Sequence, residues 1–386
     1  MRALVLGAGM MGRAIAYDLS RSEGVEGVVV GDLSFKTARE AARWCGSEGV
    51  RPLRVDVSRA REVESLMRRG FDVAVGAVSY RFNEALARAA IRAGISFCDL
   101  GGNTGVVRRE LALHERARRA GVNIVPDCGL APGMATVLAA HAVERLGGRA
   151  DEVRIRVGGL PLHPRPPLNY KLVFSPEGLT NEYLEKAVVL RSGKVTEVES
   201  LTELEELNFP PPFGTLEAFA TSGGASTLPF TMAGRVGELD YKTIRYPGHC
   251  EMMRAIFSLG LGSMEPVKIG EARVVPRELL HELLRRSLTD SDRDAVLMRV
   301  WARRGGESVR FEMVDYGVPE KGITAMMKTT GFPASAVAWM LASGAVRKKG
   351  AIPQELCIPG REFLGMLRPR GFVIDETHGS GGEGRE

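Results

Sequence analysis

The sequence of 386 residues is poor in amide side chains, with one glutamine (Gln354) and six asparagines. Arginine, by contrast, far outnumbers lysine. Amide side chains are thermolabile, and proteins of thermophiles contain few of them. The composition therefore suggests a thermophilic protein, while a codon bias toward arginine would explain part of the same pattern.

The sequence also lacks long apolar runs and closely spaced cysteines. Hydrophobic residues make up 44% of the chain, but no run approaches the roughly 20 residues of a membrane-spanning helix. The first apolar strand begins close to Met1, so we expect no signal peptide. The five cysteines are far apart, and no two have the spacing of metal ligands. We therefore expect reduced thiols, no bound metal, and a cytoplasmic protein without a membrane partner.

The formal net charge is +5, but the basic residues are scattered among acids. The densest basic cluster, Arg116, Arg118 and Arg119, lies beside Glu115 on a predicted helix. Such mixed charge is typical of a solvated helix face, whereas a nucleic-acid site has its basic residues gathered on one face. We expect no nucleic-acid partner. A chain of this length has room for two domains.

A glycine-rich turn follows the first apolar strand. Residues 3–6 run into Gly7-Ala8-Gly9-Met10-Met11-Gly12, which has the pattern Gly-x-Gly-x-x-Gly. In such a turn Gly7 permits the tight bend, Gly9 lets the backbone approach a pyrophosphate, and Gly12 lets the helix pack closely on its strand. The helix N-terminus offers unpaired N–H groups and a partial positive charge to the phosphates. The motif predicts a dinucleotide site.

The next apolar run, residues 28–31, ends in Asp32, at the distance expected of the acid that binds a ribose 2′-OH. A carboxylate there repels the 2′-phosphate of NADP. We therefore expect NAD as the cofactor and NADP as the weaker ligand. Lys36 lies nearby in the sequence and keeps this preference from being absolute.

Residues 1–126 alternate short apolar segments with helical patterns, which predicts a doubly wound parallel sheet, the Rossmann fold. The six predicted strands are residues 3–6, 27–31, 52–55, 72–76, 96–98 and 122–125. Ligands of such a sheet lie outside the carboxyl ends of its strands. Besides the three glycines and Asp32, we therefore assign to the cofactor Met10, Met11, Asp56, Val57, Ala77, Val78 and Gly101.

From about Ala131 the pattern changes to longer alternating strands, which predicts a mixed sheet in a second, α+β domain. The predicted strands there are residues 153–157, 243–246, 295–302 and 308–314. We expect a Rossmann domain (1–130) and a substrate and dimerisation domain (131–325). A helical segment (326–375) would return to the Rossmann domain, and a glycine-rich tail (376–386) would be disordered.

Two aspartates stand at predicted strand ends. Asp99 follows the fifth strand and precedes Gly101, and Asp127 follows the sixth strand at the start of a helix. Each is a candidate acid or base for substrate chemistry. Each also has the ordinary interpretation of a turn or helix-start aspartate.

Several motifs resemble the saccharopine dehydrogenase-like family and, within it, the lysine 6-dehydrogenases. The resemblance covers residues 1 to about 375, in order. It is carried by the glycine turn 7–12, the segment around Tyr80, Asp-Leu-Gly-Gly at 99–102, Asp-Cys-Gly-Leu-Ala-Pro-Gly-Met at 127–134, the proline-rich segment 157–171, and the segments 174–179, 216–224 and 242–249.

The resemblance implies NAD-dependent oxidative deamination of the ε-amine of lysine by a homodimer, giving ammonia and an aldehyde that cyclises. Such chemistry needs an acid or base near the amine. Asp99 and Asp127 are the first candidates. His249 is a rival proton carrier because the pKa of imidazole lies nearer neutrality, although a structural histidine in a turn is the commoner case.

The resemblance also suggests residues that bind the substrate. Arg245 would hold the α-carboxylate through its planar guanidinium, or else form a structural ion pair. Further candidates are Tyr80, Tyr170, Lys171 and Thr221. Two alternatives remain open: a saccharopine- or carboxynorspermidine-type enzyme acting on a secondary amine, and a non-catalytic NAD-binding regulator.

Overall fold

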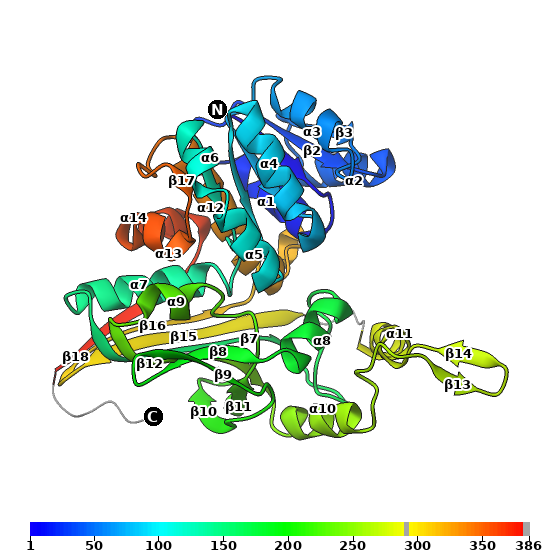
Figure 1. Ribbon diagram of the computed structural model, residues 1–386, viewed down its shortest axis with the longest axis vertical. Helices are drawn as coiled ribbons and strands as arrows, with labels where there is room; N and C mark the ends of the chain where they lie inside the picture. Colours follow the sequence, from blue (N-terminus) through cyan, green and yellow to red (C-terminus); the bar gives the residue numbers. More distant parts are fainter. Residues whose placement is uncertain (289–292, 381–386) are drawn as a thin grey trace. The chain divides into compact units, whose positions relative to one another are not determined.

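The computed structural model describes residues 1–288 and 293–380, and the chain forms two compact units (Figure 1). Unit 1 comprises Met1–His141 and Met327–Val373. Unit 2 comprises Ala142–Met326, together with the described residues from Ile374 onward. Unit 1 is therefore discontinuous in sequence, because a C-terminal segment joins the N-terminal one.

Unit 1 is built on a parallel sheet whose order, among the described residues, is β17-β6-β5-β4-β1-β2-β3. The strands are β1 (Arg2–Leu6), β2 (Gly27–Asp32), β3 (Val50–Arg54), β4 (Val73–Gly76), β5 (Ser96–Asp99), β6 (Asn123–Val125) and β17 (Gly350–Ala351). The strand order reverses between β1 and β4, which is where ligands bind in such sheets. The prediction of a doubly wound α/β fold is confirmed.

Helices cover this sheet and bury its apolar side chains. They are α1 (Met10–Leu19), α2 (Phe35–Cys45), α3 (Ala60–Met67), η1 (Tyr80–Phe82), α4 (Asn83–Ala93), α5 (Thr104–Leu111), α6 (His114–Arg119), α13 (Gln354–Cys357), α14 (Gly360–Leu367), η3 (Arg368–Arg370), and parts of α7 (Met134–Arg145) and α12 (Ala325–Ala342). Leu4, Leu6, Phe97 and Ile124 form part of one fully buried core cluster. Local capping fixes helix starts: the Asn103 side chain accepts the Val106 N–H at the start of α5.

Unit 2 contains a mixed sheet with the main order β10-β11-β12-β7-β15-β16-β18 in the described chain; β8 pairs with β12, and β9 pairs with β8. Its strands are β7 (Ala150–Pro161), β8 (Ala187–Arg191), β9 (Lys194–Val198), β10 (Glu205–Phe209), β11 (Gly214–Ala220), β12 (Val236–Arg245), β15 (Asp294–Arg304), β16 (Glu307–Asp315) and β18 (Asp375–Ser380). Strands β12 and β7 are parallel, and β7 and β15 are antiparallel. The predicted mixed sheet is confirmed.

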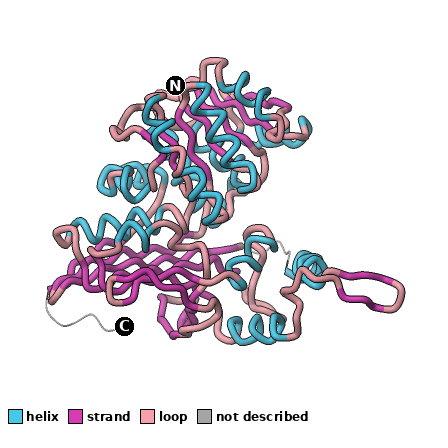
Figure 2. The backbone as a smooth tube through the Cα atoms, in the orientation of Figure 1, coloured by secondary structure: helices cyan, strands magenta, loops and turns pink. Residues whose placement is uncertain are grey.

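The other elements of unit 2 are α8 (Pro176–Leu184), α9 (Leu228–Met232), α10 (His249–Ser258), β13 (Val267–Ile269), β14 (Ala272–Val274), α11 (Pro276–Leu288) and η2 (Pro319–Lys321). Figure 2 shows β13 and β14 as a separate two-stranded hairpin extending beyond α11, away from the large sheet of this unit. Val267 and Ile269 in this hairpin are exposed.

The predicted disordered tail is wrong for residues 376–380, because they belong to strand β18. This strand pairs antiparallel with β16, with Glu376 opposite Phe311 and His378 opposite Val309. An edge strand offers unpaired backbone groups that bind an extended segment whatever its side chains. The glycine-rich composition therefore gave no sign of the pairing. Residues 381–386 lie outside the described residues.

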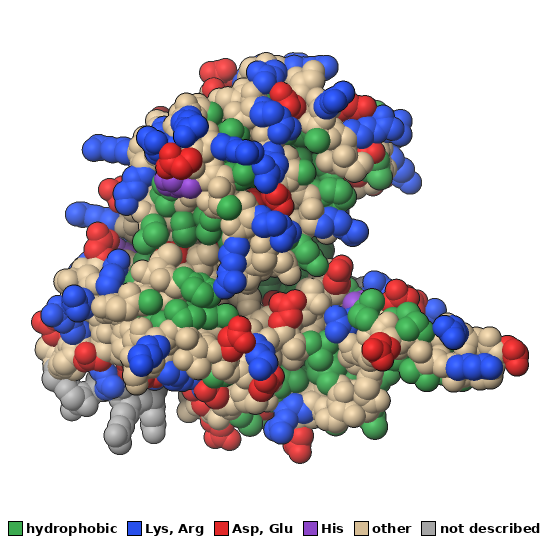
Figure 3. Space-filling view, in the orientation of Figure 1, with side chains coloured by type: hydrophobic (Ala, Val, Ile, Leu, Met, Phe, Trp, Pro, Cys, Tyr) green, Lys and Arg blue, Asp and Glu red, His purple; other side chains and the backbone are tan. Residues whose placement is uncertain are grey.

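The surface matches the scattered charges of the sequence. Figure 3 shows basic and acidic side chains interspersed over the visible face. Within the described residues, no helix has both the length and the apolar character needed to cross a membrane.

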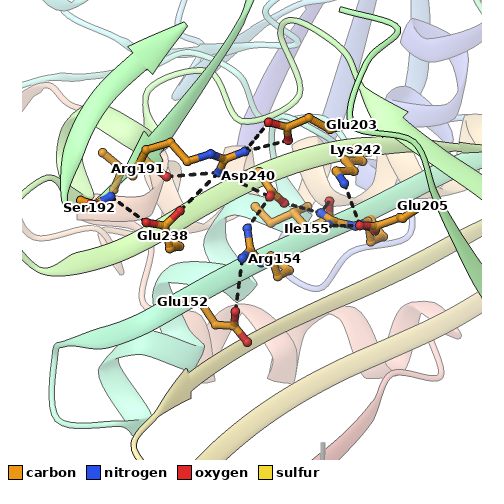
Figure 4. A network of polar contacts seen from close by, with 12 residues as sticks. Glu152, Arg154, Ile155, Arg191, Ser192, Glu203, Glu205, Glu238, Asp240 and Lys242 are labelled. Atoms are coloured by element: carbon orange, nitrogen blue, oxygen red, sulfur yellow. Dashed lines mark hydrogen bonds and ion pairs between the residues drawn. The ribbon is translucent and has the colours of Figure 1, made fainter. Parts of the chain in front are cut away.

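A network of ion pairs lies within the sheet of unit 2 (Figure 4). Arg156 on β7 contacts Asp240 on β12 at 2.6 Å, and the two side chains are only 2% and 4% exposed. Arg154 also pairs with Asp240, and Lys242 pairs with Glu205 at 2.7 Å. Burial by itself would raise the pKa of Asp240, but Arg156 and Arg154 outweigh it and hold the pKa below its usual range. Each of these buried charges has an oppositely charged partner, which compensates for the loss of hydration.

Asp240→Asn should lower the free energy of unfolding by about 3–5 kcal/mol, because it removes the buried carboxylate that pairs with both Arg156 and Arg154. Denaturant unfolding at neutral pH measures the change. Glu282→Gln is the matched control, since Glu282 pairs with Arg285 and Arg286 on the exposed surface of α11; its cost should stay below about 1 kcal/mol. Equal losses of unfolding free energy in the two variants would show that the buried ion pair stabilises the fold no more than an exposed one.

Candidate functional site

The glycine turn between β1 and α1 is shaped by close backbone contacts. A Cβ atom on Gly7 would lie 2.3 Å from the Ala77 carbonyl oxygen, and one on Gly12 would lie 1.8 Å from the Gly7 carbonyl oxygen. A Cβ on Gly9 would meet nothing within 4 Å. Gly9 is also the N-cap of α1, and no described side chain caps that helix. Open space therefore adjoins free N–H groups at a helix N-terminus, which fits a pyrophosphate.

Asp32 ends β2 beside this turn. Its Oδ2 accepts the Ala8 N–H at 3.0 Å, and its Oδ1 accepts the Ser34 N–H at 2.9 Å. These bonds fix the carboxylate next to the glycine turn. A carboxylate has further acceptor capacity on both oxygens, so Asp32 fits the hydroxyl groups of a ribose. Met10, at the start of α1, is half-exposed.

The other predicted cofactor residues lie at the carboxyl ends of β3, β4 and β5. Asp56 follows β3 and accepts hydrogen bonds from the Ser58 hydroxyl at 2.6 Å and the Ser58 N–H at 3.0 Å, which lower its pKa. Val57 and Val78 pack at the margin of the core. The Ala77 N–H donates to the Leu6 carbonyl at 2.7 Å. Their contacts with a cofactor remain predictions.

Asp99 and Asp127 meet around Gly101. The Asp99 side chain is fully buried, and its Oδ1 accepts the Gly101 N–H at 2.7 Å. A Cβ on Gly101 would lie 1.8 Å from Asp127 Oδ1, so only glycine fits there. Burial raises the pKa of Asp99 to about 6, against the opposing effect of its hydrogen bonds. The structure thus brings together the two acids that the sequence singled out. Tyr80 also lies at this edge, with its ring next to Gly102.

Three residues that support these acids were missed by the sequence analysis. Glu110 on α5 and Asn83 at the start of α4 are buried beside Asp99. The Gln354 amide donates to the Asp127 carbonyl and to Thr136 Oγ1. Asp127 has a φ of +66°, a left-handed conformation that is uncommon outside glycine. Of these three residues, only Gln354 stands out in the sequence, because it is the sole glutamine of the chain.

A second polar cluster lies within unit 2, where β12, α8 and α10 contribute Arg245, Tyr183 and His249 (Figure 1). Arg245 is 3% exposed, and its Nε–H donates to the Tyr183 hydroxyl at 3.0 Å. That hydroxyl lies 3.1 Å from His249 Nε2, and His249 Nδ1 lies 2.9 Å from the Leu168 carbonyl. A carbonyl only accepts, so Nδ1 carries the proton. Nε2 therefore accepts from Tyr183.

This chain of hydrogen bonds keeps His249 neutral. Burial, and then the positive charge of Arg245, lower its pKa to about 3. Both ring nitrogens are engaged inside the protein. The geometry therefore supports an orienting role for His249 and argues against the predicted role of proton carrier at neutral pH.

The Arg245 guanidinium has aromatic and acidic neighbours. It lies 4.6 Å from the centroid of the Tyr170 ring. The Tyr170 hydroxyl is buried beside the Val173 backbone, and no side chain in the described part of the chain forms a hydrogen bond with it. Glu182 on α8 is partly buried, and this burial raises its pKa to about 7 despite the nearby charge of Arg245. The sequence did not single out Glu182 or Tyr183, because their helix has no distinctive motif.

Thr221 and Lys171 lie in the same unit. Thr221 is buried, and its hydroxyl lies 2.7 Å from that of Thr243, which in turn donates to the Tyr241 hydroxyl. Lys171 directly follows Tyr170 and is partly exposed. Within the described residues, no cluster of histidine, cysteine and acidic side chains has the arrangement of a metal site.

Two family models cover most of the chain. "Saccharopine dehydrogenase NADP binding domain" matches residues 3–125, and "Saccharopine dehydrogenase C-terminal domain" matches residues 129–372. The chain belongs to the saccharopine dehydrogenase family. Dehydrogenases of this family are NAD(P)-dependent oxidoreductases that act on CH–NH groups. The N-terminal part of unit 1 is accordingly an NAD(P)-binding domain.

Relatives with curated names are distant. The mitochondrial alpha-aminoadipic semialdehyde synthase of Rattus norvegicus is 22% identical over 327 residues, which cover 82% of this chain and 34% of that protein. The chain thus spans about a third of its length. "Saccharopine dehydrogenase [NADP(+), L-glutamate-forming]" of Pyricularia oryzae is 23% identical over 304 residues, which cover 76% of this chain and 65% of that protein.

Solved structures show the same fold. The L-Glu-forming saccharopine dehydrogenase of Saccharomyces cerevisiae has a TM-score of 0.79 at 18% identity, covering 98% of this chain and 99% of that chain. The homospermidine synthase of Legionella pneumophila, in complex with NAD, has a TM-score of 0.65 at 11% identity, covering 97% and 91%. One relative is thus named for NADP and another is seen with NAD. The preference of this chain for NAD remains a prediction.

Asp32→Ala should raise the Kd for NADH about tenfold or more, because the loss of a charge-assisted hydrogen bond to ribose costs about 1.5–3 kcal/mol. The Kd for NADPH should rise less, since the repulsion of its 2′-phosphate is removed as well. Isothermal titration with each nucleotide measures both constants. Glu40→Ala on the exposed side of α2 is the control and should leave them unchanged. An unaltered Kd for NADH in Asp32→Ala would contradict the ribose assignment.

Proposed function

We propose that the protein is an NAD-dependent amino-acid dehydrogenase that oxidatively deaminates the ε-amine of L-lysine, giving ammonia and an aldehyde that cyclises. The observation that carries this proposal is the position of two buried acids, Asp99 and Asp127, at the sheet edge that holds the glycine turn of unit 1. The motifs that resemble lysine 6-dehydrogenases support the choice of lysine.

The acids suit the proton chemistry of amine oxidation. The nicotinamide, when bound, supplies the hydride acceptor. The substrate ammonium must first lose a proton, and water must later add to the imine. Asp99, with its pKa raised to about 6 by burial, can accept a proton near neutral pH and release it again. Asp127 lies beside it around Gly101 and can hold the ammonium by charge.

The cluster in unit 2 suits the head of an α-amino acid. Tyr183 and the Ile244 carbonyl hold the guanidinium of Arg245 in place through Nε and Nη1. A planar guanidinium binds a carboxylate in a defined orientation. The buried Tyr170 hydroxyl has a hydrogen bond to offer, and the Glu182 carboxylate can accept one from the α-ammonium. Tyr80, Lys171 and Thr221 stay predictions for the substrate.

A secondary amine such as saccharopine is the second candidate substrate. Both the Pyricularia oryzae relative and the Saccharomyces cerevisiae structure carry the name saccharopine dehydrogenase. The same acids would serve that reaction, since it also removes a hydride next to an amine nitrogen. The carboxynorspermidine-type enzyme and the non-catalytic NAD-binding regulator are the remaining alternatives.

We also propose that the protein is a cytoplasmic homodimer. The support is the resemblance, together with large exposed apolar side chains in unit 2, among them Leu259, Val267 and Ile269. Such side chains are often covered in an assembly. A monomeric mass by light scattering would contradict the dimer.

With NAD+ at alkaline pH, the purified chain should reduce the cofactor in the presence of lysine, because alkaline pH favours the free amine and takes up the released proton. The absorbance of reduced nicotinamide measures turnover across amino acids, saccharopine and polyamine conjugates, with NAD+ and with NADP+. Turnover with saccharopine alone would favour the secondary-amine enzyme. NADH binding without any turnover would favour the regulator.

Arg245→Lys should raise the KM for lysine about tenfold or more and change kcat less, because a point charge replaces a planar donor pair. Steady-state kinetics measure both parameters, and thermal unfolding checks that the variant folds. Arg254→Lys on the exposed side of α10 is the matched control and should behave like the wild type. An unchanged KM in folded Arg245→Lys would make the arginine a structural residue.

A further inference from the structure

Unit 1 buries two carboxyl groups against each other. Asp99 ends β5 and Glu110 lies on α5, and both side chains are 0% exposed. Asp99 Oδ2 and both carboxylate oxygens of Glu110 have no hydrogen-bond donor among the described groups. Buried polar atoms are nearly always satisfied. These three oxygens can only accept hydrogen bonds if both acids are ionised, so a proton on one of the acids is needed to form a hydrogen bond between them.

The surroundings offer these acids no counter-charge. In the described part of the chain, no lysine, arginine or histidine forms an ion pair with Asp99 or Glu110. The charged groups that face Glu110 are Asp99, Asp127 and Glu84. Glu84 is itself neutralised by Arg88 at 2.8 Å and Arg109 at 2.7 Å. Two buried like charges in contact do not both ionise.

We propose that Glu110 is a positioning residue that stays protonated in the folded protein and donates its O–H to Asp99 Oδ2. One proton then satisfies the unpartnered Asp99 oxygen and the protonated Glu110 oxygen. It also leaves Asp99 as the ionised member of the pair, with Oδ1 fixed by the Gly101 N–H at 2.7 Å. The shared proton is independent of the proposed function, whereas its use in catalysis rests on that function.

The electrostatics agree with this assignment. Burial, and then the charge of Asp99, raise the pKa of Glu110 to about 11. The pKa of Asp99 is raised only to about 6, because the hydrogen bond to Glu110 favours its ionised form. Asp99 therefore ionises first and Glu110 keeps the proton. In the proposed reaction an N–H bond of the substrate ammonium breaks, its electron pair stays on nitrogen, and an O–H bond forms on Asp99.

The retained proton has a consequence for stability. The folded pKa of Glu110 lies above the unfolded value, so between these two values the folded chain holds a proton that the unfolded chain has released. The contribution of Glu110 to stability is fully present below the unfolded pKa. It is lost as the pH rises toward the folded pKa. Unfolding near neutral pH should therefore release one proton from this site.

Glu110→Gln tests the proposal, because glutamine keeps the shape and an N–H donor toward Asp99 but has no proton to release. The free energy of unfolding of the full chain is measured against pH between about pH 6 and about pH 8. The free energy of unfolding falls as the pH rises. The slope of this fall should be less steep in Glu110→Gln than in the wild type, by the amount that corresponds to one released proton per molecule. Glu115→Gln on exposed α6 is the control and should keep the wild-type slope. A wild-type slope in Glu110→Gln would overturn the proposal.

If Glu110→Gln does not fold, infrared difference spectroscopy tests the proposal instead, by detecting the protonated carboxyl group directly. The wild type at about pH 8 should show the band of a protonated carboxyl group without cofactor or substrate. Asp99→Asn should keep that band, because burial alone still raises the pKa of Glu110, whereas the band would vanish if Asp99 carried the proton. Absence of the band from the wild type, or its loss in Asp99→Asn, would overturn the proposal. Neither measurement uses turnover, so a failure of the proposed function is seen separately in the substrate screen.

Discussion

Every strand of the unit 1 sheet runs in the same direction, and the site depends on this constraint. Parallel strands end at one edge, so four groups lie on the same side: the glycine turn after β1, Asp32 and Asp99 at the ends of β2 and β5, and Asp127 after β6. No single strand brings these groups together. A strand inserted in the opposite direction would move its polar residue to the far edge.

The structure buries polar groups in two ways. In the sheet of unit 2, Arg156 is paired with Asp240, and Arg245 donates to Tyr183. In unit 1, no cation forms an ion pair with Asp99 or Glu110 within the described residues. Pairing fixes geometry and lowers acid pKa values, whereas unpaired burial raises them. The first arrangement suits recognition of a substrate, and the second suits the movement of a proton.

Much of this arrangement could be predicted from the sequence, because apolar runs define strands and their ends are local. The strand containing Val28, the glycine turn and the placement of Asp99 and Asp127 all follow from residues close together in the chain. Strands β17 and β18 could not be predicted in this way. They are short or polar, and they form because an existing edge offers backbone partners.

The roles of individual polar residues were harder to predict because they depend on burial. Glu110 stands in a run of charged residues on α5 and has the sequence pattern of a solvated helix face. Its burial results from packing against β5 and α4. His249 was considered for its intrinsic pKa, but Tyr183 and Leu168 occupy its two nitrogens. Contacts between residues distant in sequence decided both cases.

The discontinuity of unit 1 affects how the molecule is made. Strand β17 adds to β6 through the Gly350 N–H and the Ile352 N–H, and Gln354 then bonds the Asp127 carbonyl. These groups are synthesised more than two hundred residues after the strand that they complete. During synthesis the nucleotide-binding sheet therefore emerges with an open edge and an unsupported Asp127. The site takes its final form only after the ribosome has synthesised Gln354.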